Sequence, residues 1–247
     1  MSFEGKIKAG DFKKVIDSVS RLVDEIKLQI TEDGVQTKAS DPANVAMVIL
    51  SINKEGFDSF SLDEEMEIGL DLDKLEDILG VASSSDFVEL STEDGSTLDV
   101  EVGGFEYNLS LLDPSTIQEQ PEIPNLDLPS KIIMEGKTLK KAVKAAEKVS
   151  DYLILVTQGK KLTIKAEGDS DSVKLDLEEE DLIEIESEKD SRSLFSLDYL
   201  SDMSKSLSSA DRVEMELGSD YPIKLKFPIV NEEGKVEYML APRIESE

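Results

Sequence analysis

The sequence predicts an α+β fold made of two similar halves, each with antiparallel sheets and two helices. Short segments in which apolar and polar residues alternate recur along the chain, and this period is typical of half-buried strands. Longer segments have the apolar spacing of amphipathic helices. The order helix, strands, helix, strands occurs in both halves, as expected for antiparallel sheets with helices packed on one face.

In the first half, helices are predicted over residues 11–22 and 72–82, where apolar side chains fall on one arc. Strands are predicted wherever the alternation or a short apolar run occurs. They cover residues 26–31, 35–40, 45–52, 66–70, 87–91, 97–102 and 105–112.

In the second half, the same reasoning predicts helices over residues 137–149 and 197–208. Strands are predicted over residues 152–157, 161–166, 172–177, 182–187, 212–217, 223–229 and 235–240.

The two halves also resemble each other in sequence. Val35-Gln-Thr-Lys-Ala39 aligns with Leu162-Thr-Ile-Lys-Ala166, and the helical segments before them align at the same offset. This period is far longer than a solenoid repeat, so it indicates a duplicated domain. Residues 113–130 contain four of the eight prolines and are predicted to form an extended linker. We therefore expect domains at 1–112 and 131–247, joined by the linker 113–130.

Positive charge gathers on one face of the helix predicted at 137–149, although the formal net charge of the chain is −28. A lone lysine-rich helix is usually only a solvated face. The first helix, however, carries a weaker copy of the stripe. With this copy, an anion-binding role is as well supported as a solvated face. The lysines of the stronger stripe are Lys137, Lys140, Lys141, Lys144 and Lys148.

Composition excludes several classes of site. The chain has no Cys and no His, which removes disulfides, thiolate metal sites and the commonest general base. Gly136-Lys-Thr138 resembles the end of a P-loop, but Lys131 stands at the required first glycine and Ile132 to Met134 is strand-like. The acidic clusters 169–171 and 178–181 lack the spacing of a calcium loop. We expect no cofactor, no metal and no enzymatic activity; a carboxylate hydrolase remains the alternative from another class.

No apolar run is long enough to span a membrane, and no secretory leader is present at the N-terminus, so we expect a cytoplasmic protein.

Four motifs in order carry a resemblance to a known family. They are Ser40-Asp-Pro-Ala-Asn-Val45-Ala-Met47, Glu55-Gly-Phe-Asp58, Phe195-Ser-Leu-Asp-Tyr-Leu200 and Tyr238-Met-Leu-Ala-Pro242-Arg-Ile244. With the duplication and the linker, they resemble the proliferating cell nuclear antigen family, the sliding clamps of replication, in its archaeal form.

The resemblance implies a DNA-clamp fold, with sheets outside and helices inside, that closes as a homotrimeric ring. Such a ring encircles duplex DNA without sequence specificity and acts as a processivity factor in DNA replication and repair. The implied partners are DNA polymerase, the clamp loader, flap endonuclease and DNA ligase. The implied location is the nucleoid, or the nucleus if the source is eukaryotic. The alternative is a DNA-damage checkpoint clamp subunit of the same fold.

The resemblance also implies three sets of site residues. The DNA-lining set is Lys13, Lys14, Arg21, Lys137, Lys140, Lys141, Lys144, Lys148 and Lys205. The partner-peptide set is Val45, Met47, Ile123, Pro124, Pro222, Ala241 and Pro242, with Ser40 and Met239 at the rim. The subunit-interface set is Tyr107, Leu109, Leu111, Val173 and Leu175. Asp77 and Gly80 depart from the positive charge that the resemblance implies for the helix at 72–82.

Overall fold

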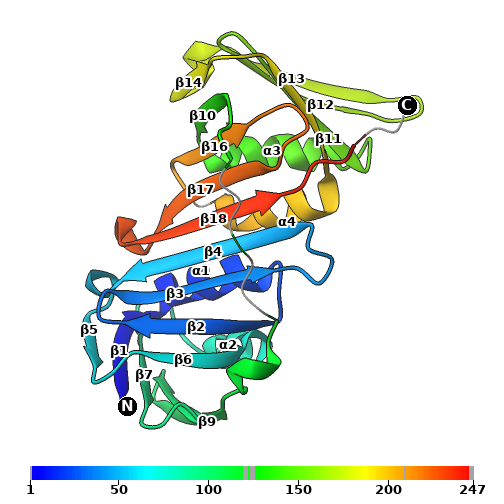
Figure 1. Cartoon of the computed structure of the whole chain (residues 1–247). Coiled ribbons are helices and arrows are strands. Elements are labelled where there is room, and N and C mark those ends of the chain that lie inside the picture. Colours follow the sequence, from blue (N-terminus) through cyan, green and yellow to red (C-terminus); the bar gives the residue numbers. More distant parts are fainter. Residues whose placement is uncertain (1, 119–121, 123–125, 209, 245–247) are drawn as a thin grey trace. The chain divides into compact units, whose positions relative to one another are not determined.

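The computed structural model describes residues 2–118, 122, 126–208 and 210–244 (Figure 1). The chain forms two compact units. The N-terminal unit contains Met1–Pro42, Met47–Glu122 and Pro228–Val236, and the C-terminal unit contains Ala43–Ala46, Ile123–Phe227 and Glu237–Glu247.

The N-terminal unit consists of antiparallel sheet and the helices α1 (Ala9–Ser20) and α2 (Leu72–Leu79), which pack against each other. One sheet has the order β5-β1-β7-β8-β9, and a second group of strands has the order β4-β3-β2-β6. The strands are β1 (Phe3–Lys8), β2 (Glu25–Thr31), β3 (Gly34–Ser40), β4 (Ala46–Asn53), β5 (Ser59–Leu62), β6 (Met66–Asp71), β7 (Phe87–Thr92), β8 (Thr97–Val102) and β9 (Phe105–Ser110). A short 3-10 turn, η2 (Pro114–Thr116), follows β9.

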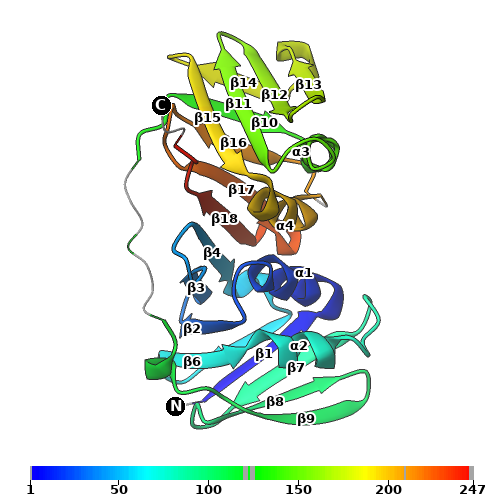
Figure 2. The same cartoon turned by 90° about the vertical axis from the view of Figure 1, so that its right-hand side faces the viewer.

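The C-terminal unit repeats this plan with helices α3 (Gly136–Ala146) and α4 (Leu197–Leu207), which lie side by side (Figure 2). Its strands follow the orders β13-β12-β11-β15 and β14-β10-β16-β17-β18. The strands are β10 (Ser130–Met134), β11 (Tyr152–Gln158), β12 (Lys161–Glu167), β13 (Ser172–Leu177), β14 (Glu184–Ser187), β15 (Ser191–Ser196), β16 (Val213–Leu217), β17 (Ile223–Ile229) and β18 (Gly234–Leu240).

Each helix is held by one apolar face. In α1 the buried face includes Phe12, Val15 and Val19, and in α3 it includes Leu139 and Val143. Burial of side chains this large is the main stabilising contribution to such helices, since helices of about three turns are marginal alone. The polar faces of α1 and α3 are therefore left exposed.

The predicted helices and the duplicated α+β plan are confirmed, but α2 and α3 are shorter than predicted. α2 ends at Leu79 rather than at residue 82, and α3 ends at Ala146 rather than at residue 149. The Val149 N–H donates to the Ala146 carbonyl in a turn after α3, 2.9 Å away. Lys148 therefore lies beyond the helix that was predicted to contain it.

Strands β1, β5 and β15 were not predicted, and of β10 only Ile132 to Met134 was recognised as strand-like. In β1, Gly5 occupies an inward position between Phe3 and Ile7, which weakens the apolar alternation. In β15, inward-facing Ser193 is a polar residue whose hydroxyl donates to the Gly218 carbonyl, 2.7 Å away. Buried serine and glycine hide the period on which the prediction depends.

No helix in the described residues is long and apolar enough to cross a membrane.

Candidate nucleic-acid and partner interfaces

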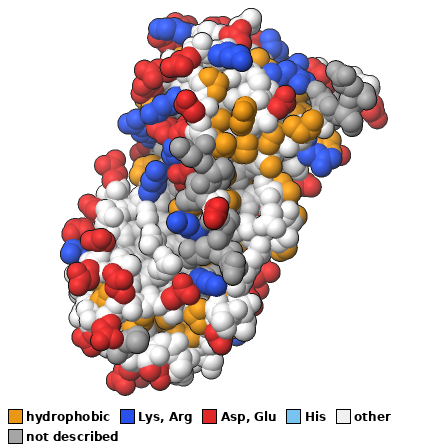
Figure 3. Space-filling view, in the orientation of Figure 1, with side chains coloured by type: hydrophobic (Ala, Val, Ile, Leu, Met, Phe, Trp, Pro, Cys, Tyr) orange, Lys and Arg blue, Asp and Glu red, His pale blue; other side chains and the backbone are white. Residues whose placement is uncertain are grey.

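The exposed face of α3 and the turn after it present lysines whose ammonium groups have no described partner. Lys141, Lys144 and Lys148 are exposed, and none of them forms an ion pair or side-chain hydrogen bond with a described residue. This is unusual in a chain with 55 Asp and Glu against 27 Lys and Arg. Asp and Glu side chains are spread over much of the face shown in Figure 3. Among the lysines of α3 and the turn after it, these three are therefore the most available to an external anion.

The other two lysines of α3 are engaged within the C-terminal unit. The Lys137 ammonium lies 2.9 Å from the Glu135 carboxylate. The hydrogen bond with Glu135 and the charge of its carboxylate raise the pKa of Lys137 above its ordinary value. The Lys140 ammonium donates to the Ser208 hydroxyl, 3.1 Å away, and is half-buried. The lysines predicted from sequence therefore differ in how available their ammonium groups are to an external anion.

The cations of α1 are all held by neighbouring groups. Lys13 donates to the Ala82 carbonyl over 2.6 Å, and Lys14 lies 3.3 Å from Asp11. Arg21, at the end of α1, forms a close ion pair with Asp17. An ion pair at an exposed site is weak, about 0–1 kcal/mol, so these cations can still exchange partners. They are nonetheless less available than those of α3.

The remaining helices add little free positive charge. On α4, Lys205 lies 2.7 Å from Asp202. On α2, the Lys74 ammonium lies 2.8 Å from Asp71, whose carboxylate also accepts the Lys74 N–H and caps the helix. The acidic character expected of the 72–82 segment persists in the exposed side chains of Asp77 and Glu76.

The residues predicted to bind a partner peptide are found in both units. Ser40 on β3 is opposite Met47 on β4 in the N-terminal unit. In the C-terminal unit, the Ala241 N–H donates to the Val45 carbonyl over 2.9 Å.

The predicted rim residues are among the least accessible members of this set. Ser40 is 8% exposed and Met239 is 4% exposed, so little of either side chain reaches the surface of the chain. Val45, Met47, Pro222, Ala241 and Pro242 are half-buried. Ile123 and Pro124 lie outside the described residues.

The residues predicted for the subunit interface lie on or beside strands at the ends of sheets. β9 ends one sheet of the N-terminal unit, and β13 ends one sheet of the C-terminal unit. Each therefore has one side without a described sheet neighbour, where its backbone groups can pair with another strand. The residues concerned are Tyr107 and Leu109 on β9, Leu111 just after it, and Val173 and Leu175 on β13, all half-buried.

Sequence analysis missed an exposed aromatic residue on the same edge. Phe105 begins β9, is 57% exposed, and its ring centroid lies 6.3 Å from that of Tyr107. In the sequence, the signal is an aromatic residue directly after two glycines, Gly103 and Gly104. Both glycines have positive φ in the structure. Phe105 therefore adds exposed apolar surface to the same strand that carries Tyr107 and Leu109.

The motif that resembles a P-loop has a packing explanation. The Gly136 N–H donates to the Ala210 carbonyl, 3.0 Å away, so it is not available to a phosphate. Among the described residues, no group of three or more Asp or Glu could hold a metal ion.

Two family models match the chain. Proliferating cell nuclear antigen, N-terminal domain, matches residues 2–102, and Proliferating cell nuclear antigen, C-terminal domain, matches residues 122–243. The chain belongs to the proliferating cell nuclear antigen family.

Clamps of this family from two archaea are similar in sequence over their whole length. The DNA polymerase sliding clamp of Methanocella arvoryzae is 49% identical over 246 residues, which cover 99% of this chain and 100% of that protein. The DNA polymerase sliding clamp of Methanococcoides burtonii is 48% identical, with the same coverage of both chains. The archaeal form of the resemblance is thus confirmed.

A solved clamp structure supports the same fold. The structure described as the C-terminal region of FEN-1 bound to A. fulgidus PCNA has a TM-score of 0.95 and 43% identity, covering 99% of this chain and 100% of that chain. The antiparallel sheets and the two pairs of helices found here are those of the clamp fold, as predicted.

Proposed function

We propose that this chain is a DNA sliding clamp whose copies close head to tail into a homotrimeric ring around duplex DNA. The ring would hold DNA polymerase on its template and act as a processivity factor. Family membership over the whole chain supports this assignment, since the matched clamps are named for DNA polymerase. We also propose the domains 1–112 and 131–247, with the linker 113–130 between them.

The observation that carries the proposal is that Lys141, Lys144 and Lys148 pair with none of the described residues, in a strongly acidic chain. Acidic side chains elsewhere repel DNA, so duplex DNA is attracted to this face rather than to the rest of the surface. Lysine is a hydrated point charge without the fork geometry by which Arg reads bases. Contacts to phosphates alone fix no sequence, which suits a protein that slides.

Ring closure would depend on the free sides of β9 and β13. A strand of one subunit that pairs with a different strand of the next makes a head-to-tail interface, and such interfaces give a ring when the rotation closes. Pairing would also cover edges that otherwise promote aggregation. Retention on DNA would then come from topology, so each lysine contact can remain weak.

Partner enzymes would dock through short peptides on the residues around Val45 and Met47. The A. fulgidus clamp in the matched structure is bound to the C-terminal region of FEN-1, which makes flap endonuclease the best supported partner. An apolar groove that receives a short helical segment with bulky anchors is a common mode of recognition. We include the clamp loader and DNA ligase in the same proposal.

We infer that the protein acts without catalysis or cofactor, in the compartment that holds the genome. The absence of His and Cys from the sequence supports this inference, because the commonest general base and the thiol nucleophile are missing.

Light scattering on the purified chain tests the proposal against a checkpoint clamp. A checkpoint clamp of this fold would assemble from unlike subunits, whereas a replication clamp assembles from one chain. We expect the mass of a trimer from the chain alone. A stable monomer at micromolar concentration would contradict the homotrimer.

A further inference from the structure

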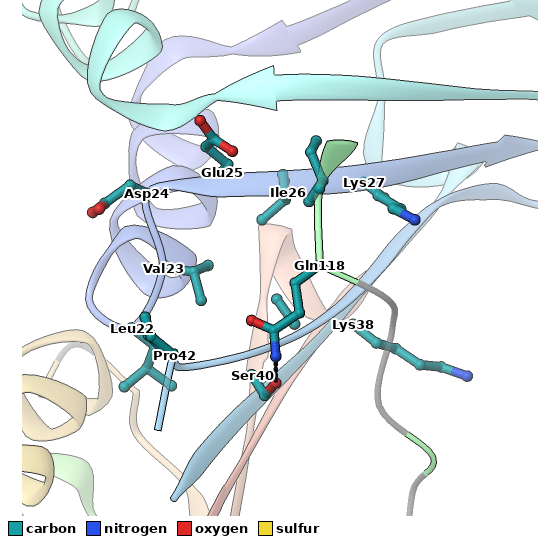
Figure 4. A pocket seen from close by; sticks show the side chains of 12 residues that line it. Leu22, Val23, Asp24, Glu25, Ile26, Lys27, Lys38, Ser40, Pro42 and Gln118 are labelled. Atoms are coloured by element: carbon teal, nitrogen blue, oxygen red, sulfur yellow. Dashed lines mark hydrogen bonds between the residues drawn. The ribbon is translucent and has the colours of Figure 1, made fainter. Parts of the chain in front are cut away.

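A cavity of about 240 Å³ lies in the N-terminal unit, beside the two residues that directly follow η2 (Figure 4). Its walls come from the turn after α1, from the ends of β2 and β3 that meet there, and from Ile117 and Gln118. Ile117 is buried, and the Gln118 side-chain amide donates to the Ser40 hydroxyl over 3.3 Å. Ile117 and Gln118 are thereby held along one side of the cavity.

The charge changes sign from one end of the cavity to the other. Asp24 and Glu25 lie at one end, and the side chains of Lys27 and Lys38 extend from the other (Figure 4). A negatively charged group that enters the cavity is therefore repelled from the first end and attracted to the second.

Lys27 and Lys38 have no described anionic partner. Neither forms an ion pair or side-chain hydrogen bond with a described residue. The adjacent strands provide none, because Lys27 is opposite Gly69 on β6 and Lys38 is opposite Ile49 on β4. Both lysines are half-buried, so their charges are less screened than those of fully exposed groups. Two cations that line the same cavity, neither of them paired with a described residue, favour an external carboxylate.

The cavity shares one wall residue with the set that we assign to peptide docking. Ser40 belongs both to the cavity wall and to the docking set. In sequence, Gln118 is five residues before Ile123 of the same set. A peptide that contacts Ser40 therefore lies beside the cavity.

We propose that this cavity binds a carboxylate on the flank of a partner's docking peptide, through Lys27 and Lys38. The inference rests on the proposed docking function and adds a chemical preference to it: partners with Asp or Glu beside the apolar anchor bind more tightly. The occupant is an acidic peptide segment rather than the backbone of a nucleic acid, because Asp24 and Glu25 repel an extended polyanion.

The test uses fluorescein-labelled peptides with the sequence of the C-terminal region of A. fulgidus FEN-1 and the full-length clamp. In separate peptides, either the two residues before the apolar anchor or the two residues after it are changed to Glu-Glu. The same positions are changed to Gln-Gln as a neutral control. Fluorescence anisotropy then gives Kd at about 50 mM and about 500 mM salt. We expect Glu-Glu to lower Kd about fivefold relative to Gln-Gln on the side that reaches the cavity, because half-exposed charge pairs contribute modestly. The gain disappears at high salt.

The variant Lys27→Gln/Lys38→Gln is expected to lose the preference for Glu-Glu while its Kd for the Gln-Gln peptide is unchanged. Its matched control is Lys8→Gln/Lys54→Gln, which removes two exposed lysines outside the cavity and keeps the preference. If the Gln-Gln peptide binds and Glu-Glu gives no gain on either side, the inference is wrong and docking stands. If no version of the peptide binds, docking and the inference both fail. If the variant weakens binding to duplex DNA and not to Glu-Glu peptides, the ligand is nucleic acid and the inference is overturned.

Discussion

Gly136 at the start of α3 lies directly against the Leu207 carbonyl at the end of α4, so closely that a Cβ atom on Gly136 would overlap the carbonyl oxygen. The Gly136 N–H also donates to the Ala210 carbonyl, 3.0 Å away. The two helices of the C-terminal unit are therefore in direct backbone contact at one end. This contact fixes the direction in which α3 presents its lysines.

Replacing Gly136 by Ala is expected to lower the free energy of unfolding by about 1–3 kcal/mol, because backbone must move to admit the methyl group. Urea denaturation followed by circular dichroism measures the change. The control Lys141→Ala, exposed on the same helix, should shift stability by less than about 0.5 kcal/mol. Equal stability of Gly136→Ala and the parent would show that the close approach is not required.

Removing unpaired lysines should weaken binding to duplex DNA more than removing paired ones. We expect Lys141→Gln/Lys144→Gln to make the negative slope of log K against log salt shallower, by about 0.9 for each phosphate that the protein no longer neutralises. The control Lys14→Gln/Lys205→Gln removes cations that already face Asp11 and Asp202, and should change the slope less. Binding of a short duplex at several salt concentrations gives both slopes. Equal slopes for the two double variants would contradict the claim that the unpaired lysines contribute more to DNA binding than the paired ones.

A proline at Asn108 should prevent trimer formation while leaving the subunit folded. The Leu111 N–H donates to the Ser96 carbonyl, so alternate N–H groups along β9 point toward β8, and that of Asn108 points away from it. Proline is tolerated at an edge position whose N–H has no partner within the sheet. We expect Asn108→Pro to elute as a folded monomer, by circular dichroism and light scattering.

Asn108→Ala is the matched control, since it also removes the 2.6 Å side-chain bond to Asp99 but keeps the backbone donor. It should remain a trimer. A trimeric Asn108→Pro protein would place the interface elsewhere.

Acid should remove a contribution that Asp71 makes to stability. The hydrogen bond from the Lys74 side chain, joined by backbone donors and the Lys74 charge, holds the pKa of Asp71 below its ordinary value of 3.8. The folded state therefore binds the proton more weakly than the unfolded state. The contribution is complete above the unfolded pKa and is lost as pH falls through the lower folded pKa.

Asp71→Asn keeps a capping oxygen and removes the charge, so at pH 7 we expect a decrease of about 0.5–1 kcal/mol in unfolding free energy. The deficit should shrink as the pH falls below about 4, where the parent carboxylate begins to be protonated. Asp73→Asn, two positions further along α2 and without a described side-chain bond, is the control. A deficit independent of pH would show that the Asp71 charge is not its cause.

The sequence was sufficient to predict the fold plan and the position of the lysine stripe, because both depend on local periodicity. It could not predict which cations are free. The bonds from Lys13 to Ala82 and from Lys140 to Ser208 join residues 69 and 68 positions apart, and only the packed helices bring them together. The strand at Phe3–Lys8 was missed because Gly5 interrupts the apolar alternation on its buried face. Exposure of Phe105 likewise follows from strand order, which no local pattern reveals.

The central claim is that the protein stays on DNA because it encircles it. The most direct measurement loads the protein, with its clamp loader and ATP, onto a nicked circular plasmid and follows retention by gel filtration before and after linearisation. We predict that the protein remains with the circle and dissociates once a single cut creates ends. Equal retention on circular and linear DNA would contradict encirclement and would instead indicate binding by surface attraction alone.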